Sequence, residues 1–174
     1  TTTEIYDYLK LLFARIGRTY SPVSGQEVRC YSVDDVAARI LAEKEGSRII
    51  IAAPIRLAAG QGLIEKMTLL LSDGLMRVRT GGETRLIEEV LPTIGPDTKA
   101  EAFEVVIDRL RLTADDDTAT RVRDSVARAF SYGNGICIVA GENGEESYSS
   151  RFEADGIEFE PPTEHLFSFN NPLG

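Results

Sequence analysis

Two short turn signals constrain the fold of this 174-residue chain more than any other feature. Gly81-Gly82 and Asn143-Gly144 each separate two short runs of strand-forming residues. Glycine and asparagine tolerate the positive φ angles of tight hairpin turns, so each pair predicts two antiparallel strands joined by a short loop. The first predicted hairpin spans residues 75–87, and the second joins residues 136–140 to residues 147–152. The sheet must therefore be largely antiparallel.

Apolar residues with helical spacing surround these hairpins. Four helices are predicted: residues 5–16, a segment that Ser32 caps and Gly46 stops, residues 63–71, and a segment that opens at Asp115-Asp116-Asp117. Two further strands are predicted at residues 48–55 and 102–112. The order helix, helix, strand, helix, hairpin, strand, helix, hairpin predicts an α+β fold with a mostly antiparallel sheet and about four helices.

The register of the first hairpin decides where its arginines lie. A strict two-residue loop would pair Val78 with Arg85 and mix apolar and charged side chains on both faces. One extra loop or bulge residue restores an apolar face and places Arg77, Arg79 and Arg85 together on the other. The apolar pattern favours the bulged register, so we predict an arginine face on this hairpin.

The long strand at residues 102–112 contains a phase slip. The apolar residues from Phe103 to Ile107 share one parity, whereas Leu110 and Leu112 share the other. The slip falls at Asp108-Arg109, which predicts a β-bulge there. A bulge re-aims side chains, and arginines on a rigid strand bind carboxylate or phosphate in a bidentate way. Two interpretations stay open: these arginines form a solvated sheet face, or they form a docking site.

The charge distribution argues against an autonomous nucleic-acid-binding domain. Residues 1–87 carry 12 Lys and Arg against 10 Asp and Glu, whereas residues 88–174 carry 7 against 18, for a net charge of −9. Binding to phosphates needs a basic surface. Cys30 and Cys137 cannot form a disulfide framework, and apolar runs such as residues 49–53 are far shorter than the roughly 20 residues of a membrane span. A cytoplasmic protein without a membrane anchor is predicted.

A small nucleotide- or phosphate-binding enzyme domain is the alternative interpretation. Gly60-Gln61-Gly62 precedes a predicted helix but lacks the Lys-Ser/Thr ending of a phosphate-binding loop. Asp115-Asp116-Asp117 offers carboxylates for a cation, although acids at a helix start are also favoured by the helix dipole. Asp117 and Arg121 are spaced as an i,i+4 pair on a solvated helix face. The single histidine, His165, leaves no multi-histidine metal site.

Several ordered motifs resemble the UvrA family, the damage-sensing ABC-type ATPase subunit of bacterial nucleotide excision repair. They are the segments TTTEIYDYL at 1–9, LLFARIG at 11–17, API at 53–55, MRVR at 76–79, EVVIDRL at 104–110 and LFSFN at 166–170. The resemblance runs from end to end. In that family such a segment lies between the Walker A loop and the later signature and Walker B motifs of the first ATPase half. None of those motifs is found here, so the resemblance implies a non-catalytic piece of a larger protein whose parent is a homodimer.

The resemblance also implies a partner and a site. Residues 31–147 are similar to the inserted domain that docks UvrB, and the flanks 1–30 and 148–174 resemble parts of the signature region, which contacts DNA only in the full-length protein. The family's partner contacts match Arg77 and Arg109, with Arg79 and Asp108 as their neighbours. The resemblance therefore favours a docking site over a solvated sheet face for these residues.

A structural zinc ion is implied by the family but not by this sequence. Many relatives have two cysteine pairs where this chain has Ser21-Pro22-Val23-Ser24 and the shortened segment 152–156. Serine is a poor zinc ligand because its hydroxyl stays protonated. We therefore predict that the chain folds without zinc and holds no cofactor of its own.

Overall fold

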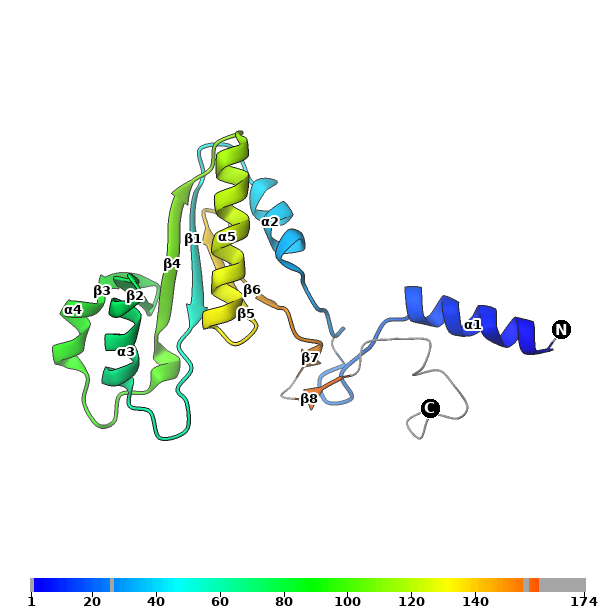
Figure 1. Ribbon diagram of the computed structural model, residues 1–174, viewed down its shortest axis with the longest axis horizontal. Coiled ribbons are helices and arrows are strands. Elements are labelled where there is room, and N and C mark those ends of the chain that lie inside the picture. The colour runs from blue at the N-terminus through cyan, green and yellow to red at the C-terminus, as the bar shows by residue number, and fades with distance from the viewer. Residues whose placement is uncertain (1, 26, 155–156, 160–174) are drawn as a thin grey trace. The chain divides into compact units, whose positions relative to one another are not determined.

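A computed structural model describes residues 2–25, 27–154 and 157–159 of the chain (Figure 1). The contacts divide it into two compact units. One unit is Tyr31–Ser150, and the other combines residues 1–30 with residues 151–174.

The larger unit contains a six-stranded sheet with the order β3-β2-β4-β1-β5-β6. Every neighbouring pair is antiparallel, which confirms the predicted α+β fold. The strands are β1 (Arg48–Pro54), β2 (Arg77–Thr80), β3 (Glu83–Leu86), β4 (Glu104–Arg111), β5 (Ile136–Gly141) and β6 (Gly144–Ser149).

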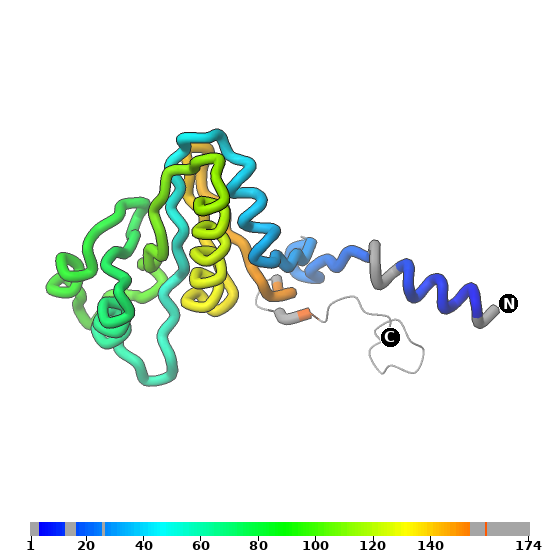
Figure 2. The backbone as a smooth tube through the Cα atoms, turned by 45° about the horizontal axis from the view of Figure 1, so that its top comes forward, coloured from blue at the N-terminus to red at the C-terminus, as the bar shows by residue number. Residues whose placement is uncertain are grey.

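Four helices of this unit accompany the sheet. They are α2 (Val33–Leu41), α3 (Leu63–Ser72), the short α4 (Ile87–Val90) and α5 (Asp116–Tyr132). Helix α5 packs against β1 and β5, and α2 packs against α5 (Figure 2). Two predicted caps are confirmed: Ser32 forms a capping box with Asp35, and the Asp115 carboxylate accepts a hydrogen bond from the Thr118 N–H at 2.6 Å.

The sheet has two faces that differ in what covers them. Ile49, Ile51 and Ala53 of β1 belong to the apolar core shared with α2 and α5. The alternate residues point the other way because side chains alternate along a strand. Ile50 pairs with both Arg109 of β4 and Ala140 of β5. We call the face that carries Ile50 and Arg109, opposite α5, the far face.

The predicted register of the first hairpin is wrong. Gly81 and Gly82 adopt φ angles of +56° and +83°, so they form the strict two-residue loop and pair Val78 with Arg85. Two consecutive residues with positive φ give the turn whose twist matches that of the flanking strands. The predicted arginine face is therefore wrong as well, since Arg85 shares the face of buried Val78 and lies opposite to the face of Arg77.

Three other predictions need smaller corrections. The β4 bulge exists but lies one residue earlier than expected, because Ile51 pairs with Asp108 and Ala52 pairs with Val106, which leaves Ile107 as the extra residue. Strand β6 begins at Gly144 rather than at residue 147. Helix α4 is additional to the four predicted helices, and it starts where the hairpin ends.

The smaller unit contains α1 (Thr2–Ile16) and the two short strands β7 (Glu153–Ala154) and β8 (Ile157–Glu158). Between Thr19 and Val28 the chain turns back on itself: Tyr20 bridges Glu27, and the Val28 N–H donates to the Thr19 carbonyl at 2.8 Å. Residues 160–174, including His165 and the LFSFN motif, lie outside the described residues.

Candidate docking surface

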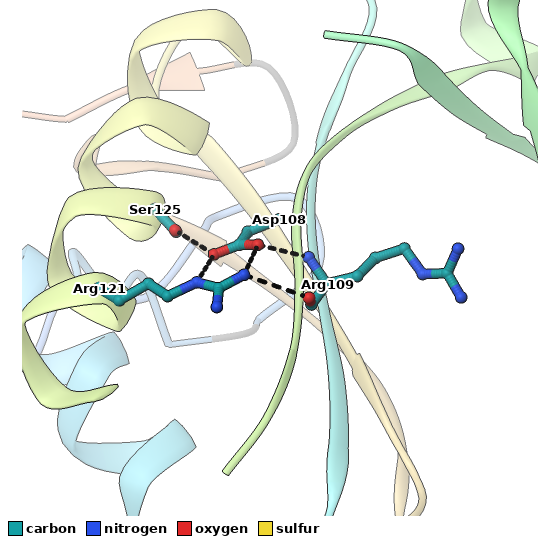
Figure 3. A network of polar contacts seen from close by, with 4 residues as sticks. All are labelled: Asp108, Arg109, Arg121 and Ser125. Carbon is teal, nitrogen blue, oxygen red and sulfur yellow. Dashed lines mark hydrogen bonds and ion pairs between the residues drawn. The ribbon is translucent and has the colours of Figure 1, made fainter. Parts of the chain in front are cut away.

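Asp108 connects strand β4 to helix α5 at the bulge (Figure 3). Its carboxylate accepts two hydrogen bonds from Arg121, at 2.8 Å from Nε and 2.7 Å from Nη2. Ser125 Oγ donates a third at 2.9 Å, and the Arg109 N–H donates a fourth at 2.7 Å. The sequence spacing predicted Asp117 as the partner of Arg121, but Arg121 reaches Asp108 on the sheet instead.

These contacts fix the ionisation of Asp108. Burial alone would raise the pKa of this carboxyl, but the hydrogen bonds from Arg121, Ser125 and the Arg109 N–H outweigh burial and hold the pKa below its usual range. Asp108 is therefore a carboxylate at neutral pH. It points toward α5 and binds groups of its own chain.

Arg109 has the opposite orientation. Its side chain extends away from the Asp108 carboxylate and is exposed on the far face (Figure 3). Arg77, at the start of β2, is also exposed, and both arginines line one groove whose wall also includes Met76 and the β4 residues 106–108. The structure therefore brings together the two residues that the family resemblance marked for partner contact.

Arg79 occupies a different environment. Only 6% of the residue is exposed, and its guanidinium forms ion pairs with Glu104, at 3.2 Å, and with Glu145. Three strands separate β2 from β6 in the sheet order, so this contact requires the sheet to bend strongly toward the far face. Burial raises the pKa of Glu104; attraction by Arg79 opposes that rise, and repulsion by Glu145 adds to it. Arg79 thus links β2 to β4 and β6 through ion pairs on the far face.

Two arginines of the far face were missed by the sequence analysis. Arg48 of β1 and Arg111 of β4 are exposed and pair directly across the two strands. Strand β1 ends at Pro54 and β4 begins only at Glu104. The register between β1 and β4 depends on the β4 bulge, and the apolar–polar alternation of the sequence did not fix the position of that bulge. No local sequence pattern therefore predicted that Arg48 and Arg111 lie together.

The candidate phosphate-binding loop at 60–62 and the candidate cation site at 115–117 have local structural roles. The Gln61 side-chain oxygen accepts a hydrogen bond from the Ala58 N–H at 3.2 Å, which closes the loop before α3. Asp115 caps α5. Within residues 2–25, 27–154 and 157–159, no group of three or more His, Cys, Asp or Glu side chains is placed to hold a metal ion. In the same ranges, no helix has the length and apolar character needed to cross a bilayer.

The residues at the position where the resemblance implies zinc do not fit that metal. Ser21 is buried, and its Oγ accepts a hydrogen bond from the Val23 N–H at 3.2 Å. The hydroxyl therefore stabilises the turn, whereas structural zinc sites are held by thiolate sulfur and imidazole nitrogen. Residues 155–156 of the second position lie outside the described part of the chain.

Comparison with known proteins identifies the family. The family model described as the UvrA interaction domain matches residues 31–143. The chain belongs to the UvrA family. It is 37% identical to the UvrABC system protein A of Methanothermobacter thermautotrophicus, 32% identical to that of Borreliella burgdorferi and 36% identical to that of Staphylococcus epidermidis. Each match covers all of this chain but only 18–19% of the relative, so the chain spans about a fifth of the length of these UvrA proteins.

Proposed function

We propose that this chain is a non-catalytic interaction module of a UvrA-type protein and docks UvrB during damage recognition in nucleotide excision repair. The observation that carries the proposal is the shared groove of Arg77 and Arg109, two exposed arginines on neighbouring strands of the matched domain. The names of the relatives, each the A component of a UvrABC system, support a partner from the same system.

The local structure suits Arg109 to bind a carboxylate. The Arg109 N–H is held by Asp108, and its carbonyl accepts from Arg121 at 3.4 Å. A side chain that extends from a fixed backbone loses less conformational entropy when it binds. Arginine also presents a planar array of donors that matches a carboxylate in a bidentate way.

The same proposal assigns different roles to different segments of the chain. Residues 31–147 form the docking domain, which agrees with the compact unit at 31–150 and the family match at 31–143. Residues 1–30 and 148–174 belong to the signature region of the parent, a cytoplasmic homodimer that contacts DNA. ATP hydrolysis belongs to the parent and not to this chain.

Calorimetric titration of the 174-residue chain with purified UvrB tests the proposal. We expect saturable binding with a Kd in the micromolar range or tighter, about −8 kcal/mol. A chain that is folded by circular dichroism and gives no binding at about 100 μM UvrB would overturn the proposed function.

A further inference from the structure

The far face continues beyond the groove of Arg77 and Arg109. A second groove is lined by Arg48, Arg109 and Arg111, with Ile50 and Leu110 beside them. Arg109 lines both grooves. The two grooves therefore share a side chain and form one surface across β2, β4 and β1, which we call the arginine surface: Arg48, Arg77, Arg109 and Arg111.

The positive charges of this surface are not balanced within the described residues. Arg79 and Arg121 each form ion pairs with carboxylates, but in residues 2–25, 27–154 and 157–159 no ion pair involves any member of the arginine surface. Moreover, Arg48 and Arg111 are direct cross-strand partners. Like charges in that position destabilise a sheet. Fold stability therefore does not explain why arginine occupies both of these positions.

We propose that Arg48 and Arg111 extend the docking surface and bind a carboxylate-bearing segment of the partner protein. This inference rests on the proposed function, because the partner is the same UvrB. The segment contacts Arg77 and Arg109 in the first groove and continues to Arg48 and Arg111 in the second. Half-buried Ile50 lies between the arginines and contributes an apolar contact.

The surroundings of the surface favour a protein over a nucleic acid. Arginines around an apolar residue are typical of the energetically important centre of protein interfaces. The far face also carries Glu104 and Glu145, and the chain has a net charge of −9. These acids repel a phosphate backbone, which needs a continuous basic surface. A partner segment with a few carboxylates can align with the arginines and avoid the acids.

Substitution of Arg48 by glutamate gives a test in which stability and binding change in different directions. Arg48→Glu replaces a like-charge cross-strand pair with an Arg–Glu pair, so the melting temperature should stay the same or rise. Binding to UvrB should weaken by about tenfold or more, and Arg48→Glu/Arg111→Glu should weaken it further. Arg85→Glu is the matched control, because Arg85 is an exposed strand arginine on the other face, and its binding should stay within about twofold.

The outcomes separate this inference from the proposed function. Suppose that Arg77→Glu and Arg109→Glu weaken UvrB binding, while Arg48→Glu and the double variant with Arg111→Glu bind like the unsubstituted chain. The extended surface is then wrong and the docking function stands. If the unsubstituted chain binds no UvrB, both the extended surface and the proposed function are overturned. A titration with a 20-base-pair duplex covers the nucleic-acid alternative: if Arg48→Glu weakens duplex binding and leaves UvrB binding unchanged, the surface binds phosphate and the inference is overturned. Should Arg48→Glu lower the melting temperature, Arg48→Gln removes the charge without adding an acid, and the same tenfold criterion applies.

Discussion

Asp108 and Arg109 are adjacent in the sequence, yet their side chains lie on opposite faces of the sheet (Figure 3). The Asp108 carboxylate is bound to Arg121 and Ser125 of α5, whereas the Arg109 guanidinium is exposed on the far face. In the docking proposal, Arg109 therefore contacts the partner and Asp108 is a positioning residue. Asp108 fixes the backbone from which Arg109 extends.

Replacement of Asp108 by asparagine should destabilise the fold. The asparagine side chain lacks the charge that pairs with Arg121, and its amide NH₂ would face the Arg121 or Ser125 donors. We expect the free energy of unfolding to fall by about 1–3 kcal/mol, measured by urea denaturation. Asp124→Asn, at an exposed position of α5, is the control and should change stability by less than about 0.5 kcal/mol. Equal stability of the two variants would contradict the positioning role.

The pH dependence of stability should carry the signature of Asp108. Because the folded state lowers the pKa of this carboxyl, its ionised form is the one that stabilises the fold. The stabilisation is fully present above the unfolded pKa, about 3.9, and is lost as the pH falls through the lower folded value. Urea denaturation between pH 7 and pH 3, at intervals of about half a unit, should show a decline that is smaller in Asp108→Asn. Identical profiles for the two proteins would contradict the assignment.

Arg79 should be more important for stability than any arginine of the exposed surface. Arg79→Ala leaves the half-buried Glu104 carboxylate without its guanidinium partner. Removing one member of a fully buried ion pair costs about 3–5 kcal/mol; here Glu104 and Glu145 are partly solvated, so we expect about 2–3 kcal/mol. Thermal or urea unfolding measures the loss, and Arg77→Ala is the matched control. A second change, Glu104→Gln, should recover part of the loss because it removes the unpaired charge.

The sequence predicted local elements better than long-range pairing. The hairpin turns, the caps at Ser32 and Asp115 and the antiparallel sheet follow from residues close together in the chain. The hairpin register was wrong because the two glycines form a strict two-residue turn, which pairs Val78 with Arg85 although this mixes the faces. The sequence pattern also placed Arg79 on an exposed face, but its ion-pair partner Glu145 lies 66 residues away, and that ion pair allows the charged side chain to be buried. The same reason explains why Arg121 was assigned to Asp117 rather than to Asp108.

The chain should fold without zinc. Ser21 stabilises its turn through its hydroxyl, and a hydroxyl does not supply the charge of a thiolate. We expect protein refolded with zinc to contain well under about one equivalent of the metal after desalting, and EDTA to leave the melting temperature unchanged. Stoichiometric zinc by atomic absorption, or melting on chelation, would contradict this prediction.

Charge reversal at Arg77 and Arg109 tests the docking surface directly. Both side chains are exposed and line one groove, so Arg77→Glu and Arg109→Glu should leave the melting temperature nearly unchanged. Each should weaken UvrB binding by at least about tenfold, or about 1.4 kcal/mol, because a reversed charge repels the partner carboxylate that the arginine had paired with. Calorimetric titration at constant ionic strength gives the Kd values.

The controls for this last prediction use the corrected hairpin register. Arg85 lies on the same hairpin as Arg77 but on the opposite face, and Arg128 is exposed on α5. If docking depended only on the total charge of the chain, all four reversals would weaken binding equally, since each changes the net charge by the same amount. If docking uses the far face, Arg85→Glu and Arg128→Glu should bind UvrB within about twofold of the parent chain. Normal binding by both Arg77→Glu and Arg109→Glu would place the docking surface elsewhere.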